Sequence, residues 1–107
     1  MTHNEIRVGD ILAGTWGYSM IIPCFYRVIK VTPTGCKVIQ LDKRMVQSTD
    51  GGYFQQGYEM PLRDTIQRGA TEKLARYDGD CYKIGSRSTA EYIRPWDGKP
   101  IWADYCD

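Results

Sequence analysis

The fold is decided by residues 25–46, which read FYRVIKVTPTGCKVIQLDKRMV. Phe25 to Thr32 is rich in aromatic and β-branched residues, which favour extended strands. Pro33-Thr34-Gly35 then supplies residues that are typical of a tight turn. From Cys36 to Val46 the chain resumes an alternating pattern, which Lys43 interrupts. We therefore predict a β-hairpin with a short Pro/Gly loop.

Further strand signals lie on both sides of this hairpin. We expect strands at residues 8–13, weakly near Tyr53-Phe54, at 72–77, at 81–85 and at 101–105. The Asp78-Gly79 pair predicts a second hairpin, because both positions tolerate a positive φ. Residues 55–68 lack clear periodicity, and most of them are interpreted as loop. Ser88-Thr89-Ala90-Glu91 fits a capping box and predicts one short helix that ends before Pro95.

These elements predict a mainly β fold in one domain, residues 1–107. Five or six strands with one helical turn indicate a single small SH3-like β-barrel, or a strongly bent antiparallel sheet, with a short helix near the C-terminus. Trp96 stands between Pro95 and an Asp97-Gly98 turn. We expect its ring to cover the open end of the barrel.

Composition and charge exclude several classes of protein. The chain is 42% hydrophobic and 25% charged, which is typical of globular proteins rather than disordered ones. Its net charge of +1 excludes a histone-like polycation and an acidic mimic of DNA, so a charged partner requires a local patch. No stretch approaches the roughly 20 apolar residues of a membrane span, and the first ten residues are polar. We expect no membrane contact and a location in the cytoplasm of a host cell.

Metal and catalytic chemistry have little support in the sequence. The four cysteines are Cys24, Cys36, Cys81 and Cys106; none forms a C-x-x-C pair, and His3 is the sole histidine. Zinc sites normally use closely spaced ligands, so we predict no metal, no cofactor and four reduced thiols. A nucleophilic dyad would have to use His3, which lies outside every expected strand. We therefore expect a protein that is not an enzyme.

Positive charge and aromatic rings gather around the first hairpin. Between residues 27 and 44 five basic residues face Asp42 alone, and Arg63, Arg68, Lys73 and Arg76 follow against Asp64 and Glu72. Cations interleaved with aromatic rings are typical of surfaces that bind single-stranded nucleic acid, although a solvated polar face has the same composition. The candidate binding residues are Trp16, Tyr18, Tyr26, Arg27, Lys30, Lys37, Lys43, Arg44 and Tyr53.

Trp16 leaves two interpretations open. It stands between Gly14 and Gly17, so its backbone is unusually free, and the ring either plugs the barrel or faces a ligand. Tyr18 is the better candidate for a reachable ring, because its hydroxyl makes exposure inexpensive. We expect Arg27 and Lys30 to be the cations near it.

Four short motifs resemble small uncharacterised proteins of phages, plasmids and integrated bacterial elements. The motifs are Gly9-Asp10-Ile11-Leu12, Trp16-Gly17-Tyr18, Phe25-Tyr26-Arg27-Val28 and Trp96-Asp97-Gly98-Lys99-Pro100. The chain departs from that pattern at Ser19 to Cys24, which is apolar rather than polar. The resemblance implies an origin in a mobile element, with accessory roles such as nucleic-acid handling or inhibition of a host defence.

The preferred hypothesis is a non-enzymatic binding module of a mobile genetic element that contacts nucleic acid through its aromatic and basic surface. The alternative is a protein-binding inhibitor of a host defence factor, in the manner of anti-CRISPR proteins. Its support is the apolar stretch Met20-Ile21-Ile22-Pro23, which could form a protein-contact patch. A toxin-like ribonuclease is a third and weaker hypothesis, supported by Gly9-Asp10-Ile11-Leu12 alone.

Overall fold

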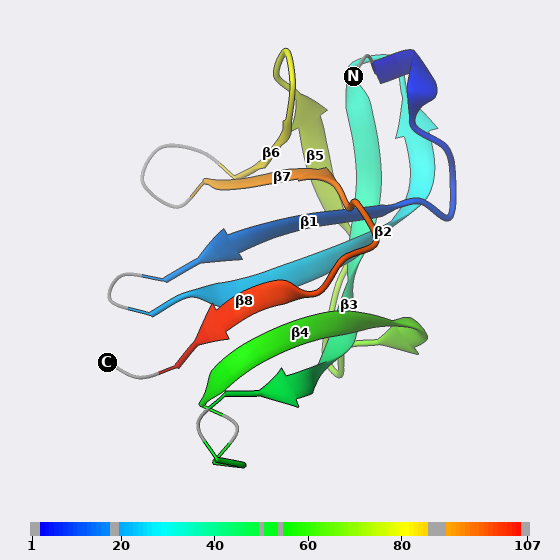
Figure 1. The fold of residues 1–107 in the computed structure, drawn as a ribbon. Coiled ribbons are helices and arrows are strands. Elements are labelled where there is room, and N and C mark those ends of the chain that lie inside the picture. The colour runs from blue at the N-terminus through cyan, green and yellow to red at the C-terminus, as the bar shows by residue number, and fades with distance from the viewer. Residues whose placement is uncertain (1–2, 18–19, 50, 54, 86–89, 106–107) are drawn as a thin grey trace.

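Six strands close into an antiparallel barrel in the computed structural model, which describes residues 3–17, 20–49, 51–53, 55–85 and 90–105 (Figure 1). The strands pair in the order β2-β1-β7-β6-β5-β3-β4-β8, and an additional pairing of β2 with β3 closes the ring. The bounds are β1 (Ile11–Trp16), β2 (Ile22–Thr32), β3 (Gly35–Ser48), β4 (Gln56–Ile66), β5 (Lys73–Tyr77), β6 (Tyr82–Ile84), β7 (Glu91–Pro95) and β8 (Ile101–Asp104). The prediction of a small β-barrel is confirmed.

The long strand β3 belongs to two parts of the molecule. Its first half forms the predicted hairpin with β2, in which Thr32 pairs with Gly35 and Tyr26 with Gln40. Its second half pairs with β4, and β4 pairs with β8, which builds a three-stranded extension below the barrel in Figure 1. A bridge between Ile21 and Asp104 links β8 back to the start of β2.

Alternating residues of β1 and β2 fill two separate cores. Leu12 and Tyr26 face the barrel interior, whereas their neighbours Ile11 and Phe25 pack with Leu41 beneath the extension. Burying such a side chain stabilises the fold by roughly 1.5–3 kcal/mol. Strands β1 and β2 bury apolar side chains on both of their faces. The barrel core consists of Ile6, Leu12, Cys24, Tyr26, Val28, Cys36, Val38, Ala75, Tyr82, Ile84 and Ile93.

Aromatic rings close the barrel at a different place from the one expected. The Trp96 and Phe25 rings form a T-shaped pair, with ring centroids 5.8 Å apart, so Trp96 covers the second core rather than an open barrel end. His3, in the 3₁₀ turn η1 (His3–Glu5), instead lies over the end formed by Tyr77 and Tyr82. Its Nε2 donates to the Thr32 carbonyl (2.6 Å), which leaves Nδ1 to accept from the Tyr82 hydroxyl (2.8 Å).

Three predicted elements were wrong. Residues 56–66, interpreted as loop, form strand β4, whose buried side carries Gly57, Glu59 and Pro61 and so shows no hydrophobic alternation. Residues 91–95, predicted as the end of a helix, form strand β7, because β1 and β6 both pair with this segment. No α-helix occurs in the described residues, and Ser88 and Thr89 of the capping box lie outside them. Tyr53 follows a turn and belongs to no strand, and Phe54 lies outside the described residues.

No helix in the described ranges has the length and apolar character to cross a membrane.

Candidate nucleic-acid interface

The register of β2 and β3 places three of the predicted cations on one face. Lys30 pairs directly with Lys37, and Arg27 pairs with Ile39, two residues along β3 from Lys37. Ile29 is an extra residue in β2, and this bulge turns Lys30 onto the face that Arg27 shares. Because side chains two apart in a strand point to the same side, the three cations share the outer wall of the barrel.

The same wall carries further cations on β5 and β6 and an aromatic ring on β7. Leu74 pairs with Lys37, Arg76 pairs with Lys83, and Lys83 pairs with Tyr92. The Lys83 Nζ lies 5.9 Å from the centre of the Tyr92 ring, and Leu74 and Tyr92 are 54% and 49% exposed. We call this surface the basic band; it consists of Arg27, Lys30, Lys37, Leu74, Arg76, Lys83 and Tyr92.

Two pairs in the basic band oppose like charges. Side chains directly opposite in an antiparallel pair have Cβ atoms about 4.5–5.5 Å apart, so Lys30 with Lys37 and Arg76 with Lys83 repel each other. No carboxylate of the described residues forms an ion pair with these four cations. Asp78 and Asp80 lie in the turn between β5 and β6, where they form no ion pair with the band. The wall therefore holds uncompensated positive charge.

Lys43, predicted as a binding residue, is part of a buried polar network. Its ammonium donates to the Pro23 carbonyl and to the Tyr105 hydroxyl, both at 2.7 Å, and lies 3.1 Å from the Glu59 carboxylate. The Tyr105 hydroxyl in turn donates to Glu59 Oε1 at 2.6 Å, and Glu59 is only 5% exposed. Burial, together with the Glu59 carboxylate, raises the pKa of Tyr105. Lys43 therefore balances a buried charge instead of facing solvent.

Tyr26 also lies inside the protein. Its ring is 1% exposed in the barrel core, and its hydroxyl donates to Glu91 Oε2 at 2.7 Å. Burial, and then the bond to Glu91, raise the pKa of this phenol. The Tyr26 ring is therefore not a surface on which a ligand can stack.

The remaining predicted residues are not gathered with the basic band. Arg44 is exposed on the extension, seven residues along β3 from Lys37, which corresponds to about 23 Å of strand. Tyr53 is 80% exposed in the connection between β3 and β4. Tyr18 lies outside the described residues.

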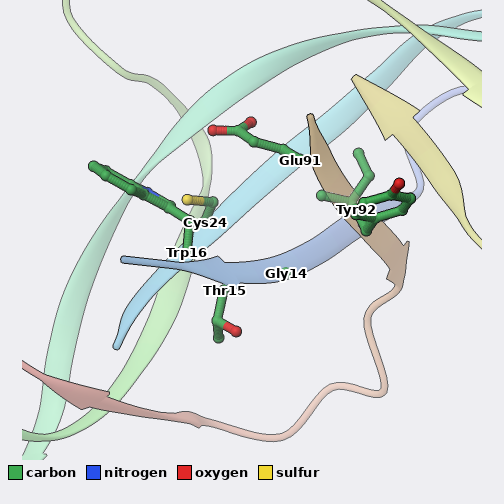
Figure 2. A pocket seen from close by; sticks show the side chains of 7 residues that line it. Gly14, Thr15, Trp16, Cys24, Glu91 and Tyr92 are labelled. Atoms are coloured by element: carbon green, nitrogen blue, oxygen red, sulfur yellow. The ribbon is translucent and has the colours of Figure 1, made fainter. Parts of the chain in front are cut away.

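Trp16 lies over a shallow recess at the barrel's edge (Figure 2). Its ring is 53% exposed and projects on the same side of β1 as Cys24 and Glu91, whereas Thr15 points the other way. The recess has about 10 Å³ of free volume, which is space for about one water molecule. Burial, and then the nearby Glu91 carboxylate, raise the pKa of the Cys24 thiol to about 11. The ring thus covers a buried thiol with one side and meets solvent with the other.

Four residues of the basic band were not among the predicted binding residues: Leu74, Arg76, Lys83 and Tyr92. The alternation of residues 72–77 and 81–85 places Arg76 and Lys83 at outward positions, so these two cations could have been predicted from the sequence. Tyr92 was concealed because residues 91–95 were expected to be helical, and a helix would not have joined this wall.

Grouped metal ligands and activated thiols were looked for among the described residues. No three His, Cys, Asp or Glu side chains within the described ranges are grouped so that they could hold a metal ion. Cys24, Cys36 and Cys81 are buried free thiols, and Cys106 lies outside those ranges. Burial also raises the pKa of Cys36 to about 11, so neither Cys24 nor Cys36 has the character of a reactive nucleophile.

Comparisons with protein-family models, with curated proteins and with solved structures gave no match to this chain.

Proposed function

We propose that this protein is a non-enzymatic binding module that holds a single-stranded nucleic acid along its basic band. The observation that carries the proposal is the pair of like-charged cross-strand contacts, Lys30 with Lys37 and Arg76 with Lys83. Like charges directly opposite each other destabilise a sheet. A phosphate between each pair would turn that repulsion into attraction.

The shape of the basic band favours a flexible strand over a duplex. It crosses β2, β3, β5, β6 and β7, and neighbouring strands are about 4.8 Å apart, so it covers about 19 Å of a curved wall. A stiff double helix would touch only part of such a wall, whereas a single strand can follow it. Exposed rings such as Tyr92 provide surfaces on which unpaired bases stack.

A role in nucleic-acid handling also agrees with the origin in a phage or plasmid that the resemblance of the short motifs implies. The alternative of a protein-binding inhibitor has less support. In the stretch Met20 to Pro23, Ile21 is the residue with substantial exposure, and its backbone is bonded in both directions to Asp104. Pro23 is buried, so the stretch is mostly the start of β2 rather than an apolar contact patch.

Fluorescence anisotropy with labelled 12-nucleotide DNA and RNA, single-stranded and as duplexes, tests the proposal. We expect single strands to bind more tightly than duplexes. Tyr92→Ala should weaken single-strand binding by about 1–3 kcal/mol, the usual contribution of one stacked base. Tyr53→Ala, at an exposed ring outside the band, is the matched control and should change little. Absence of binding at low salt, or equal losses in the two variants, would contradict the proposal.

A further inference from the structure

A groove lies beside the basic band, between the turn that precedes β1 and the last residues of β4. Two adjoining cavities of about 300 and 220 Å³ form it. Both are lined by Gly9, Ile11 and Arg63, the first also by Asp10 and Trp96, and the second also by Arg27 and Asp64. Arg27 shares a face with Lys30 and Lys37 as well, so it joins the groove to the basic band.

One wall of the groove is a fixed aromatic ring. The Trp96 indole N–H donates to the Lys99 carbonyl at 2.8 Å, and the ring forms a T-shaped pair with the buried Phe25 ring. The Arg63 guanidinium lies 5.6 Å from the centre of the Trp96 ring. A planar ligand would therefore meet a ring and a guanidinium that are already oriented, which lowers the entropy lost on binding.

Charged side chains of both signs line the groove. Arg27, Arg63 and Asp64 form no ion pair with any described residue. Asp10 is partly engaged, because its Oδ2 accepts the backbone N–H of Arg7 at 2.9 Å. Two guanidinium groups beside two carboxylates do not make a simple anion site. They suit a ligand that presents both hydrogen-bond donors and acceptors.

We propose that this groove binds one unstacked guanine base of the strand held on the basic band. Guanine offers O6 and N7 as acceptors to a guanidinium, and its N1–H and N2 amino group as paired donors to a carboxylate. Arg27 and Asp64 line one cavity and provide this combination, and the Arg63 guanidinium, which lies over the Trp96 ring, provides the stacking face. Adenine lacks the paired donors, and uracil and cytosine lack the O6/N7 edge. This inference rests on the proposed function and adds a base preference to it.

Titration of ¹⁵N-labelled protein with the four 5′-mononucleotides tests the base preference, with the Trp96 indole N–H resonance as the readout. GMP should shift this resonance and bind about tenfold more tightly than AMP, CMP or UMP, as one bidentate pair implies. Asp64→Asn should remove that preference, while Asp80→Asn, at an exposed carboxylate in the β5–β6 turn, should keep it. No shift of the Trp96 resonance, or equal affinity for all four nucleotides, overturns the inference.

Two single-stranded oligonucleotides separate this inference from the proposed function. One is a thymidine 12-mer, and the other carries a single central guanine in the same run. We expect both to bind, with the guanine adding about tenfold in affinity. If the thymidine 12-mer binds and guanine adds less than about twofold, this inference alone falls. If the thymidine 12-mer does not bind, the proposed function falls and the inference falls with it.

Discussion

The absence of a side chain at Gly14 lets β1 and β7 approach closely. A Cβ atom at this position would overlap the Tyr92 carbonyl oxygen and lie 3.2 Å from Cγ2 of Ile93. Both atoms belong to β7, which carries the Tyr92 ring of the basic band. Close packing between β1 and β7 therefore explains the glycine at position 14.

Gly14→Ala should lower the free energy of unfolding by about 1–3 kcal/mol, because overpacking forces the two backbones apart. Urea denaturation measures this loss. Thr15→Ala, at the exposed neighbouring position, should change the free energy of unfolding by less than about 0.5 kcal/mol. Equal effects of the two substitutions would refute the role given to Gly14.

Glu59 and Lys43 stabilise the fold only as a pair. Glu59→Leu should cost about 3–5 kcal/mol, since it leaves the Lys43 ammonium without its buried counter-charge. The double variant Lys43→Met/Glu59→Leu should recover most of that loss, because neither charge remains. Chemical denaturation of the three proteins gives the comparison, and a double variant as unstable as Glu59→Leu would show that the network is not a compensated pair.

The buried thiols make stability depend on pH in the alkaline range. Burial raises the pKa values of Cys24 and Cys36 from 9.0 to about 11, so the unfolded chain loses these protons first. The free energy of unfolding should therefore be highest below about pH 9 and fall as the pH rises to about 11. Denaturation at several pH values should show a shallower fall for Cys36→Ala, and an unchanged slope would contradict this assignment.

Whether a strand could be predicted from the sequence depends on which of its side chains face the protein interior. The hairpin of residues 25–46 could be predicted because its strands carry β-branched residues on the barrel side. Strand β4 could not, since Glu59 becomes a credible buried residue only when Lys43 and Tyr105 are known to face it. Strand β7 was concealed by local capping signals, which pairing with β1 and β6 overrides.

Only part of the candidate site could be predicted from the sequence. Lys30 and Lys37 follow from the first hairpin, because their pairing needs only the register of the turn, whereas Arg27 shares their face only through the bulge at Ile29. Tyr26 and Lys43 could not be excluded in advance, because each bonds to a carboxylate from a strand that was not predicted, Glu91 on β7 and Glu59 on β4. Tyr92 required the correct assignment of β7.

Lys37 is expected to favour binding at the expense of strand pairing. Lys37→Glu replaces a repulsive contact with Lys30 by an attractive one, so it should stabilise the fold by about 0.2–1 kcal/mol. The same change should weaken binding of a single strand. Arg44→Glu, opposite Met60 on the extension, should do neither. Thermal melts and anisotropy measure the two effects, and a Lys37→Glu protein that is less stable than the parent would argue against repulsion at this position.

At the scale of the whole molecule, the closed barrel and its extension have separate roles. The barrel presents the basic band on a curved wall, and the extension covers the second core and carries the buried Lys43 network. The end of β4 and the Trp96 turn form the groove beside Arg27. In this account the extension contributes a base-binding groove next to a surface that binds phosphates.

The salt dependence of single-strand binding is the sharpest test of the basic band as a nucleic-acid interface. Each phosphate contact contributes about 0.7 to the slope of log affinity against log salt concentration for single strands. The variant Lys30→Gln/Lys37→Gln should therefore reduce the magnitude of this slope by about 1.4. The control Arg44→Gln/Lys99→Gln removes two exposed cations outside the band and should leave the slope unchanged. The basic band would be contradicted as the nucleic-acid interface if both double variants reduced the slope equally, or if neither variant changed it.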